Sequence, residues 1–469
     1  MNRRDFLVNG ICAASAPTTR SAFAAPAQYS VTVRAHQQLG VIAPDFMGLG
    51  YEISSPARLG LLSPANKVYV QLVRTLGPRG VIRIGGNTAD YANYLPNAAP
   101  VSSAKGTVVN NAVLEDLGGF LQATGWKLIW ALDLGQGTEA EAIAEAKIIM
   151  SIAGDRLLAF EIGNEPDLFA RPKHRKPEFG YPDWLAEYRR YKAALRKEFP
   201  RIPFAGPDAA ITTDWVTRFA ADEGKDSVLL THHYYREGQN PTSSIEKLLG
   251  VDPKLQPQLT ALKAASQACG VPYRICEVNS FSGGGRPGVS DTLAGALWVL
   301  DYMFTLAANG CAGVNMETGV NHLDFISSYS PIGDDEHGHY SAKPEYYGML
   351  AFSLAGKGQL LGVESDANSP EIKTYATLQD KGSSTVTLIN KGAATQVSTV
   401  SLGEHLKAKQ GSVTRLSGPA IDAKTGITLG GAEVTPEGTW KSAKSESVPV
   451  RNGQLAVTLP PFSAAVVHF

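Results

Sequence analysis

Eight short, mostly apolar segments, separated by stretches long enough for helices, constrain the fold of this chain more than any other feature. Apolar runs of this length predict parallel strands that are buried on both faces. Eight strand and helix pairs within roughly 300 residues predict an α/β protein with a (β/α)8 TIM barrel, because an open doubly wound sheet usually has fewer strands and a phosphate-binding glycine loop. The segments are residues 47–53, 80–84, 127–134, 157–164, 203–207, 227–235, 273–279 and 312–316.

The sequence changes character after residue 356, where short alternating segments are broken by glycine, asparagine and serine. Such segments predict a C-terminal antiparallel β-sandwich domain. Residues 29–34 also alternate and precede the barrel, so we expect them to pair with this sandwich. The C-terminal segments are residues 372–378, 385–389, 396–402 and 455–459.

The first residues have the features of a twin-arginine export signal. Arg3 and Arg4 are followed by Phe6-Leu7 and a stretch of small residues, and residues 22–24 form an A-x-A cleavage site. A frayed N-terminus is the alternative. Export would make the protein periplasmic or secreted. The expected parts are a signal at 1–24, an N-terminal strand at 25–40, a catalytic barrel at 41–356 and a β-sandwich at 357–469.

Removal of residues 1–24, with three arginines and one aspartate, changes the formal net charge from −1 to −3. A weakly acidic chain is not attracted as a whole to polyanions. We therefore expect no nucleic-acid partner, no membrane partner after signal removal, and a monomer. Cys269, Cys276 and Cys311 remain and cannot all pair, so we expect buried thiols, with a Cys269–Cys311 bridge left open.

The strongest local motif is Asn164-Glu165-Pro166, which ends the fourth apolar segment. Proline cannot donate to a strand ladder, so Glu165 is expected at the carboxyl end of that strand. Catalytic groups of TIM barrels lie at this end. A glutamate that only caps a strand or a helix is the alternative.

A second glutamate, Glu277, closes the seventh segment. Glycoside hydrolysis with retention needs two carboxyl groups about 5–5.5 Å apart, one to protonate the leaving oxygen and one to attack the anomeric carbon. Rim positions on opposite sides of a small barrel can converge on that spacing. The pair predicts a retaining glycosidase with Glu165 as general acid/base and Glu277 as nucleophile.

An Asn-Glu on the fourth strand with a Glu on the seventh resembles the clan of retaining glycosidases whose catalytic glutamates lie on those strands. Further segments make the chain similar to glycoside hydrolase family 79, which contains heparanases and β-glucuronidases, as an exported, bacterial-type member. The resemblance spans about residues 45–350 and also implies a barrel with a sandwich. The segments are residues 83–90 (RIGGNTAD), residues 232–235 (HHYY), and Glu277 followed by residues 283–285 (GGG) and 290–292 (SDT).

The resemblance also implies roles in sugar binding. Asn164 would bind the hydroxyl next to the anomeric carbon, a contact that strengthens in the transition state. Glu52 and Asn87, at the ends of the first two strands, would recognise further hydroxyls. Simple strand-end polarity is the alternative for these three residues.

His233 and Tyr235 match the family's His-His-Tyr-Tyr segment, and would orient the nucleophile or line the sugar site. Neighbours on a strand alternate faces, so His233 and Tyr235 point together and His232 points away. We expect His232 to be a hydrogen-bonded core histidine.

The glycine run departs from the family pattern, because Ser282 stands where many members have a tyrosine that helps to hold the uronic carboxylate. The amides of Gly283 and Gly284 are left as the groups expected to bind it, since glycines let the main chain approach an anion closely. A flexible turn is the alternative. Residues 85–126 leave little room for the excised linker of animal heparanases, so we expect a single active polypeptide.

Neither a metal nor a cofactor is expected. The sequence has no H-E-x-x-H and no Cys/His ladder with ligand spacing. No G-x-G-x-x-G follows the first strand, and residues 283–285 lack a Walker lysine.

The expected substrate is an oligo- or polysaccharide that contains β-linked glucuronic acid. Arg171, Lys173, Arg175 and Lys176 follow Glu165 closely and are predicted to contact sulfates, which would mean heparanase-like endo-action on heparan-sulfate-type chains. A solvated loop is the alternative for this run. For the whole chain the alternatives are an exo-acting β-glucuronidase, a clan relative for neutral sugars, and an inactive carbohydrate-binding barrel.

Overall fold

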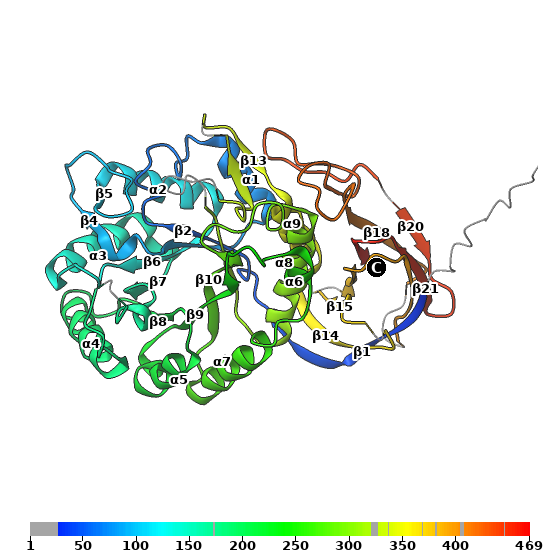
Figure 1. Cartoon of the computed structure of the whole chain (residues 1–469), viewed down its shortest axis with the longest axis horizontal. Coiled ribbons are helices and arrows are strands. Elements are labelled where there is room, and N and C mark those ends of the chain that lie inside the picture. The colour runs from blue at the N-terminus through cyan, green and yellow to red at the C-terminus, as the bar shows by residue number, and fades with distance from the viewer. Residues whose placement is uncertain are drawn as a thin grey trace, which may run out of the picture.

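The computed structural model describes residues 27–171, 174–319, 327–335, 337–367, 369–379, 382–403, 408–444 and 446–469. The expected export signal therefore lies outside the described residues. Figure 1 shows a barrel ringed by helices beside a second lobe built of strands. No helix of the described part combines the length and the apolar character needed to cross a bilayer.

The predicted barrel is confirmed. Its eight strands pair in parallel in the order β7-β6-β3-β2-β11-β10-β9-β8. The ring closes between β7 and β8, where the Phe160 amide donates to the Pro203 carbonyl at 2.9 Å. The strands are β2 (Gly48–Glu52), β3 (Val81–Gly85), β6 (Lys127–Leu132), β7 (Leu157–Ile162), β8 (Ala205–Ala209), β9 (Leu229–Gly238), β10 (Tyr273–Ser282) and β11 (Val314–Glu317).

A long helix follows each barrel strand and covers its outer face (Figure 1). The fourth of them begins at Tyr181, where the Asp183 carboxylate caps the Gly180 amide at 3.0 Å and Pro182 suits the first turn. The helices are α1 (Lys67–Leu76), α2 (Asn111–Thr124), α3 (Glu139–Ala153), α4 (Tyr181–Glu198), α5 (Thr213–Asp222), α7 (Leu255–Cys269), α8 (Leu293–Ala308) and α9 (Pro344–Ala355), with the short α6 (Ile245–Leu249) before α7.

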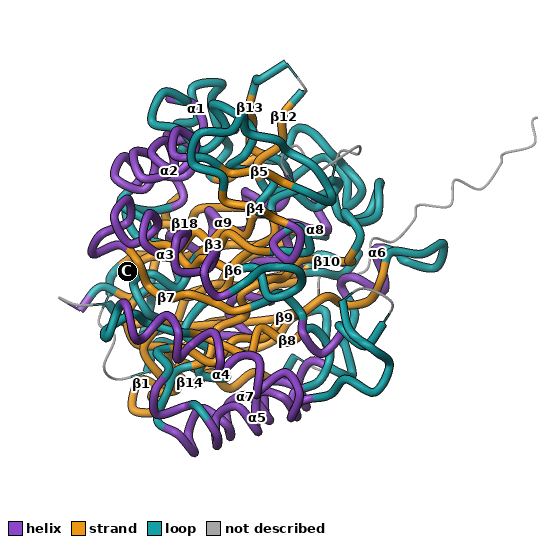
Figure 2. Tube along the Cα trace, turned by 90° about the vertical axis from the view of Figure 1, so that its left-hand side faces the viewer, coloured by secondary structure: helices purple, strands orange, loops and turns teal. Residues whose placement is uncertain are grey.

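Two small strand pairs lie in the loops that connect barrel strands to their helices. β4 (Ala92–Tyr94) pairs with β5 (Thr107–Val109), and β12 (Ile332–Asp334) pairs with β13 (Tyr340–Ala342). Figure 2 shows β12 and β13 side by side at one end of the molecule. They build up the rim on the side of the barrel where the strands end.

Helices α8 and α9 lie between the barrel and the second lobe (Figure 1). Both are apolar around most of their circumference, which is typical of helices buried on all sides. Phe304 of α8 stacks on Tyr375 of the second lobe with ring centroids 4.6 Å apart. Asp301 on the same helix forms a largely buried ion pair with Lys391 at 2.6 Å. These contacts fix the two lobes against each other.

The second lobe is the predicted sandwich, and its sheet is mixed rather than purely antiparallel. Strand β1, from the start of the chain, pairs antiparallel with β14 and parallel with β17. Val31, Leu388, Val413 and Val457 meet in one apolar core, so the sheet curls and packs against itself. The strands are β1 (Ala27–Ile42), β14 (Gly358–Ser365), β15 (Ile372–Leu378), β16 (Ser384–Asn390), β17 (Gln396–Ser401), β18 (Gln410–Ser417), β19 (Thr428–Leu429), β20 (Glu446–Pro449), β21 (Gln454–Leu459) and β22 (Ser463–His468).

The three described cysteines carry free thiols. Cys276 and Cys311 are buried and Cys269 is half-buried, and the Cys311 thiol donates to the Gly313 carbonyl at 3.1 Å. The bridge between Cys269 and Cys311 that the sequence left open does not form.

Candidate active site

A cavity of about 1010 Å³ opens at the carboxyl ends of the barrel strands. Ligand pockets commonly span about 300–1,000 Å³, so this one has room for more than one sugar ring. Eight of the nine predicted site residues line it, and the ninth, Asn164, lies next to Glu165. The eight are Glu52, Asn87, Glu165, His233, Tyr235, Glu277, Gly283 and Gly284.

Glu165 follows the end of β7 in a left-handed backbone conformation, with φ 51° and ψ 51°. This conformation costs a residue other than glycine roughly 1–3 kcal/mol and persists only where surrounding contacts impose it. The Glu165 amide donates to the Asp208 carbonyl at 3.1 Å, which ties the turn to β8. The turn directs the half-buried carboxyl group into the cavity.

Glu277 lies within β10 and has a hydrogen-bond donor on each carboxylate oxygen. Arg83 Nη1 lies 2.8 Å from Oε2, and the Tyr235 hydroxyl donates to Oε1 at 3.0 Å. Two donors fix the direction of the carboxylate. A fixed direction is what a carboxylate nucleophile needs.

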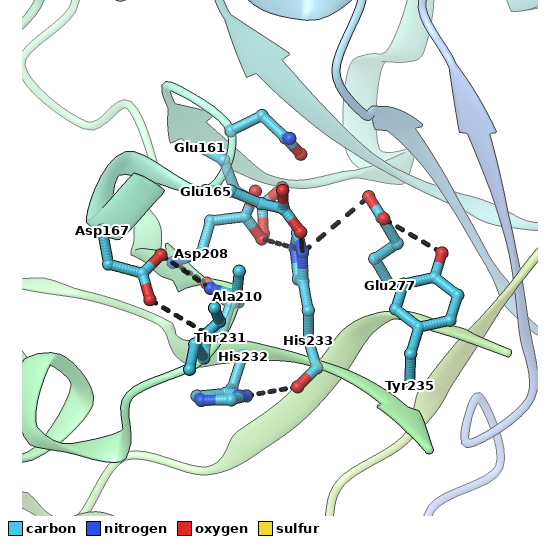
Figure 3. A network of polar contacts seen from close by, with 12 residues as sticks. Glu161, Glu165, Asp167, Asp208, Ala210, Thr231, His232, His233, Tyr235 and Glu277 are labelled. Atoms are coloured by element: carbon cyan, nitrogen blue, oxygen red, sulfur yellow. Dashed lines mark hydrogen bonds and ion pairs between the residues drawn. The ribbon is translucent and has the colours of Figure 1, made fainter. Parts of the chain in front are cut away.

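The Glu165 and Glu277 carboxyl groups face one another across the cavity (Figure 3). One carboxylate oxygen of each lies within 4.8 Å of the other. Retaining glycosidases hold the two groups about 5–5.5 Å apart, whereas inverting enzymes need about 6.5–9.5 Å to admit a water molecule. The geometry therefore supports retention.

Beneath the pair, Arg83 of β3 is fully buried and contacts acceptors from three other strands. Its guanidinium lies 3.1 Å from Glu161 Oε2, 2.7 Å from Asn164 Oδ1 and 2.6 Å from Asp208 Oδ2, in addition to the Glu277 contact. Burial opposes its charge, but Asp208, Glu161 and Glu277 outweigh burial and hold the pKa of Arg83 well above its usual value. The guanidinium thus fixes both catalytic strands by one set of bonds.

His233 lies between Glu165 and the buried Asp208. Its Nε2 is 2.8 Å from Asp208 Oδ1, its Nδ1 is 3.1 Å from Glu165 Oε1, and Nδ1 is 3.8 Å from Glu277 (Figure 3). The sequence left two roles open for His233, and the distances place it nearer to Glu165 than to Glu277. Burial disfavours its charge, but Asp208 and Glu277 raise the pKa of His233 well above its usual value.

His232 points away from the cavity, as strand alternation predicts (Figure 3). Its Nδ1 contacts the His233 carbonyl and lies 2.9 Å from Gln258 Nε2. Burial lowers the pKa of His232 to about 4, so the ring is neutral near pH 7. The residue is a hydrogen-bonded core histidine.

Asn164 is buried directly behind the acid/base. Its backbone amide donates to Asp90 Oδ2 at 3.1 Å, and Asp90 also accepts the Gly135 amide at 3.1 Å. Because the Asn164 side-chain oxygen is taken by Arg83, its amide NH₂ is the group that can meet a sugar hydroxyl. Asp90 is the last residue of the 83–90 motif, and its role is to position Asn164.

The cavity lining also includes groups suited to a sugar ring. Glu52 accepts the Thr88 amide and hydroxyl, both at 2.7 Å, and burial with the nearby Glu277 charge raises the pKa of Glu52 to about 7. Gly283 and Gly284 have φ +79° and +88°, a region that favours glycine. Neither of their amides has an acceptor among the described residues.

The sequence did not point to two further residues that line the cavity. Tyr329 lines the cavity and stacks on Tyr235 with centroids 6.2 Å apart. Glu317, the last residue of β11, also lines the cavity and is buried. A glutamate that closes the eighth apolar strand was a visible signal for Glu317, whereas nothing near Tyr329 in the sequence distinguishes it.

The basic run after Glu165 divides into different environments. Arg175 folds inward, where Nη2 lies 2.7 Å from Glu187 Oε2 and 2.9 Å from the Leu134 carbonyl, so the sulfate contact predicted for it is wrong. Arg171 is exposed and lines the cavity, and Lys176 is exposed away from it. The predicted Lys173 contact lies outside the described residues.

Two groups of side chains in the described part come close enough together to hold a metal ion. Glu161, Asp208 and Cys276 form the first group, but the Arg83 guanidinium already supplies its counter-charge. Glu165, His233 and Glu277 form the second. The hydrogen bond between His233 and Glu165 gives this group an explanation without a metal.

Comparisons with known proteins bear on both lobes. Residues 374–466 match the model of the glycosyl hydrolase family 79 C-terminal β domain. A β-glucuronidase of Aspergillus niger is 25% identical over 489 residues, covering 90% of this chain and 88% of that protein. A β-glucuronidase of Neurospora crassa is 25% identical over 506 residues, covering 85% and 88%.

Solved structures share the fold. The 4-O-α-L-rhamnosyl-β-D-glucuronidase of Fusarium oxysporum 12S, in its Rha-GlcA complex, has a TM-score of 0.79 at 18% identity and covers 94% of this chain and 100% of its own. The family 51 α-L-arabinofuranosidase of Thermotoga petrophila RKU-1 has a TM-score of 0.71 at 14% identity with the same coverage. At these identities the likeness establishes the barrel and its second lobe.

Proposed function

Because this chain is a glycoside hydrolase of family 79, we propose that it is a retaining β-glucuronidase acting on β-linked glucuronic acid. The observation that carries the proposal is the pair of carboxyl groups within 4.8 Å of each other at the barrel rim. The two curated relatives supply the sugar, since each is a β-glucuronidase and is similar to this chain over most of its length.

The mechanism is double displacement. Glu277 attacks the anomeric carbon and forms a glycosyl ester, while Glu165 gives its proton to the leaving oxygen, which departs as an alcohol. Water then replaces the aglycone. Glu165 removes a proton from it, the water oxygen attacks the anomeric carbon, and Glu277 leaves as a carboxylate.

The uronate carboxylate is proposed to sit against the Gly283 and Gly284 amides. Both amides lack an acceptor within the described residues, and both glycines line the cavity. Successive backbone amides in a turn can form an anion-binding concavity. This arrangement can replace the tyrosine that family members carry at the position of Ser282.

We expect the enzyme to prefer glucuronides over glucosides strongly. Replacing the carboxylate by a hydroxymethyl group removes the charge-assisted bonds to these amides, which are worth about 1.5–3 kcal/mol each. With matched nitrophenyl glycosides, kcat/KM should be at least about 100-fold higher for the β-D-glucuronide than for the β-D-glucoside. Comparable values would favour a clan relative for neutral sugars.

The finer proposal is endo-action on heparan-sulfate-type chains. It is supported by the size of the cavity and by Arg171, which lines it and follows Glu165 by six residues. Lys254 also lines the cavity, although its ammonium donates to the Arg236 carbonyl at 2.7 Å. Exo-action on small or oligosaccharide glucuronides remains the alternative. Product lengths released from heparan sulfate would separate the two modes.

Replacing Arg171 with serine should weaken cleavage of heparan sulfate by about 2- to 5-fold, the value of one solvent-exposed ion pair. The salt sensitivity of cleavage should fall with it. Hydrolysis of nitrophenyl glucuronide should stay within about twofold, because this substrate carries no sulfate. Lys176→Ser is the matched control, since Lys176 belongs to the same run but does not line the cavity. If Arg171→Ser affects both substrates equally, or does not affect the polymer, the basic run is better explained as a solvated loop.

We further propose that the mature protein works as an exported monomer, without nucleic-acid or membrane partners. The proposal rests on the sequence of residues 1–24 and on the small net charge of the rest. N-terminal sequencing and sedimentation of the exported protein would test it.

A further inference from the structure

Glu317 is a buried carboxyl group without a partner. The residue is 2% exposed, and neither carboxyl oxygen has a hydrogen-bond partner among the described residues. Its backbone carbonyl accepts Asn279 Nδ2 at 3.1 Å, so the strand is fixed although the side chain is not. Buried polar atoms without partners are rare in folded proteins and call for a functional explanation.

The position of Glu317 points to a ligand. It ends β11 between β2 and β10 and lines the cavity together with Glu52 and Glu277. The neighbouring strand leaves space for it, because a Cβ on Gly50 would lie 2.7 Å from Glu317 Oε2. The side chain therefore occupies a fitted place in the wall of the cavity.

Burial and the neighbouring carboxyl groups favour the protonated form of Glu317. Burial, followed by the like charges of Glu277 and Glu52, raises the pKa of Glu317 well above its usual value, although Arg83 and His233 act in the opposite direction. A protonated carboxyl group offers one O–H donor and a carbonyl acceptor, and neither is used within the described part of the protein. The groups that face Glu317 are the charged or titratable Glu52, Glu277, Arg83 and His233 and the hydroxyls of Tyr51, Tyr235 and Tyr329.

We propose that Glu317 is a specificity-determining residue that, in its protonated form, donates a hydrogen bond to the glucuronate ring of the substrate. The inference rests on the proposed β-glucuronidase activity and deepens it. An ionised Glu317 would be a further negative charge beside a substrate that is itself an anion, with little water between them. Glucuronate binding therefore requires the proton on Glu317 and weakens when that proton is lost.

The test compares Glu317→Gln with Glu317→Leu across a range of pH. For each variant, the dissociation constant is measured with D-glucuronate and KM is measured with nitrophenyl β-D-glucuronide. In the wild type we expect both to rise as Glu317 ionises, approaching tenfold per pH unit. Glutamine keeps a donor and cannot ionise, so both constants should stay nearly flat. Leucine should raise them about 10- to 100-fold throughout, the loss of one bond to a charged group.

Melting temperature and a control separate this role from a structural one. Neither oxygen has a partner to lose within the described residues, so both variants should melt at the wild-type temperature or above it. Glu145→Gln is the matched control, since Glu145 is also a buried glutamate with a pKa raised to about 8, but it lies on α3 and does not line the cavity. Its pH profile should match that of the wild type.

The outcomes distinguish the inference from the proposed function. A wild type that hydrolyses glucuronides, with variants that bind D-glucuronate as it does at every pH, overturns the role of Glu317 alone. The same holds if Glu317→Gln loses affinity with pH as steeply as the wild type. A wild type that hydrolyses no β-glucuronide overturns both.

Discussion

Glu277→Gln is expected to abolish turnover, with kcat lowered by roughly 10⁵-fold or more, the scale seen when an enzymatic nucleophile is removed. The amide is nearly isosteric with the carboxylate, but it cannot form the glycosyl ester. Its oxygen can still face Arg83 and its NH₂ can face the Tyr235 hydroxyl, the two donors that now hold the carboxylate. Steady-state hydrolysis of nitrophenyl β-D-glucuronide measures the loss.

The loss must come from chemistry and not from misfolding. The variant should keep its melting temperature. It should still bind the intact glucuronide, because the other residues that line the cavity are unchanged. Turnover within about tenfold of the wild type would assign the nucleophile to another residue.

Glu165→Ala should lower kcat/KM by about 10²- to 10⁴-fold on substrates with poor leaving groups, the contribution of general acid catalysis. Substrates with very good leaving groups need little protonation, so their first step should stay fast. Their glycosyl-enzyme should then accumulate, because no base activates water for the second step. A burst of nitrophenol followed by slow turnover is the signature to measure.

Azide distinguishes the two carboxyl groups further. A small anion can enter the space that the alanine leaves and attack the glycosyl-enzyme without base catalysis. Attack on an intermediate already inverted once gives a β-configured glycosyl azide. An α-configured product, or a variant with full activity on poor leaving groups, would overturn the assigned roles.

The barrel was predictable because each of its strands carries its own signal. A strand buried on both faces is mostly apolar along its length, so β6 is visible without knowledge of its neighbours. The pairing of β1 with β17 was not predictable in this way. Alternation in residues 29–34 indicates a strand with one buried face, but it does not say which strand it joins or in which direction.

The same distinction between local signals and tertiary contacts applies to the residues of the site. Glu165 could be predicted as a site residue because it lies in a local motif at a strand end, and Glu277 because it ends a short apolar run, although β10 continues beyond it. Arg83 belongs to the 83–90 motif, but the sequence does not show what Arg83 or Asp208 contacts, because those contacts arise only when the closing barrel brings β3 and β8 beneath the same cavity. Arg175 was misassigned for the converse reason. A basic run indicates charge, whereas the inward turn of one member depends on Glu187, twelve residues further along the chain.

The insertion of β1 between β14 and β17 has a consequence for the order of folding. Those two strands meet only through β1, so the centre of the second lobe is supplied by the residues that are synthesised first. Residues 27–42 must wait for more than three hundred residues to follow before their partners exist, which gives this contact a high sequence separation and makes it slow to form. A fragment that starts at residue 357 would lack the strand in the middle of its sheet, leaving β17 and β21 as a separate pair with marginal stability. The second lobe is thus a discontinuous folding unit, and it is completed only after the barrel between its two parts has been made.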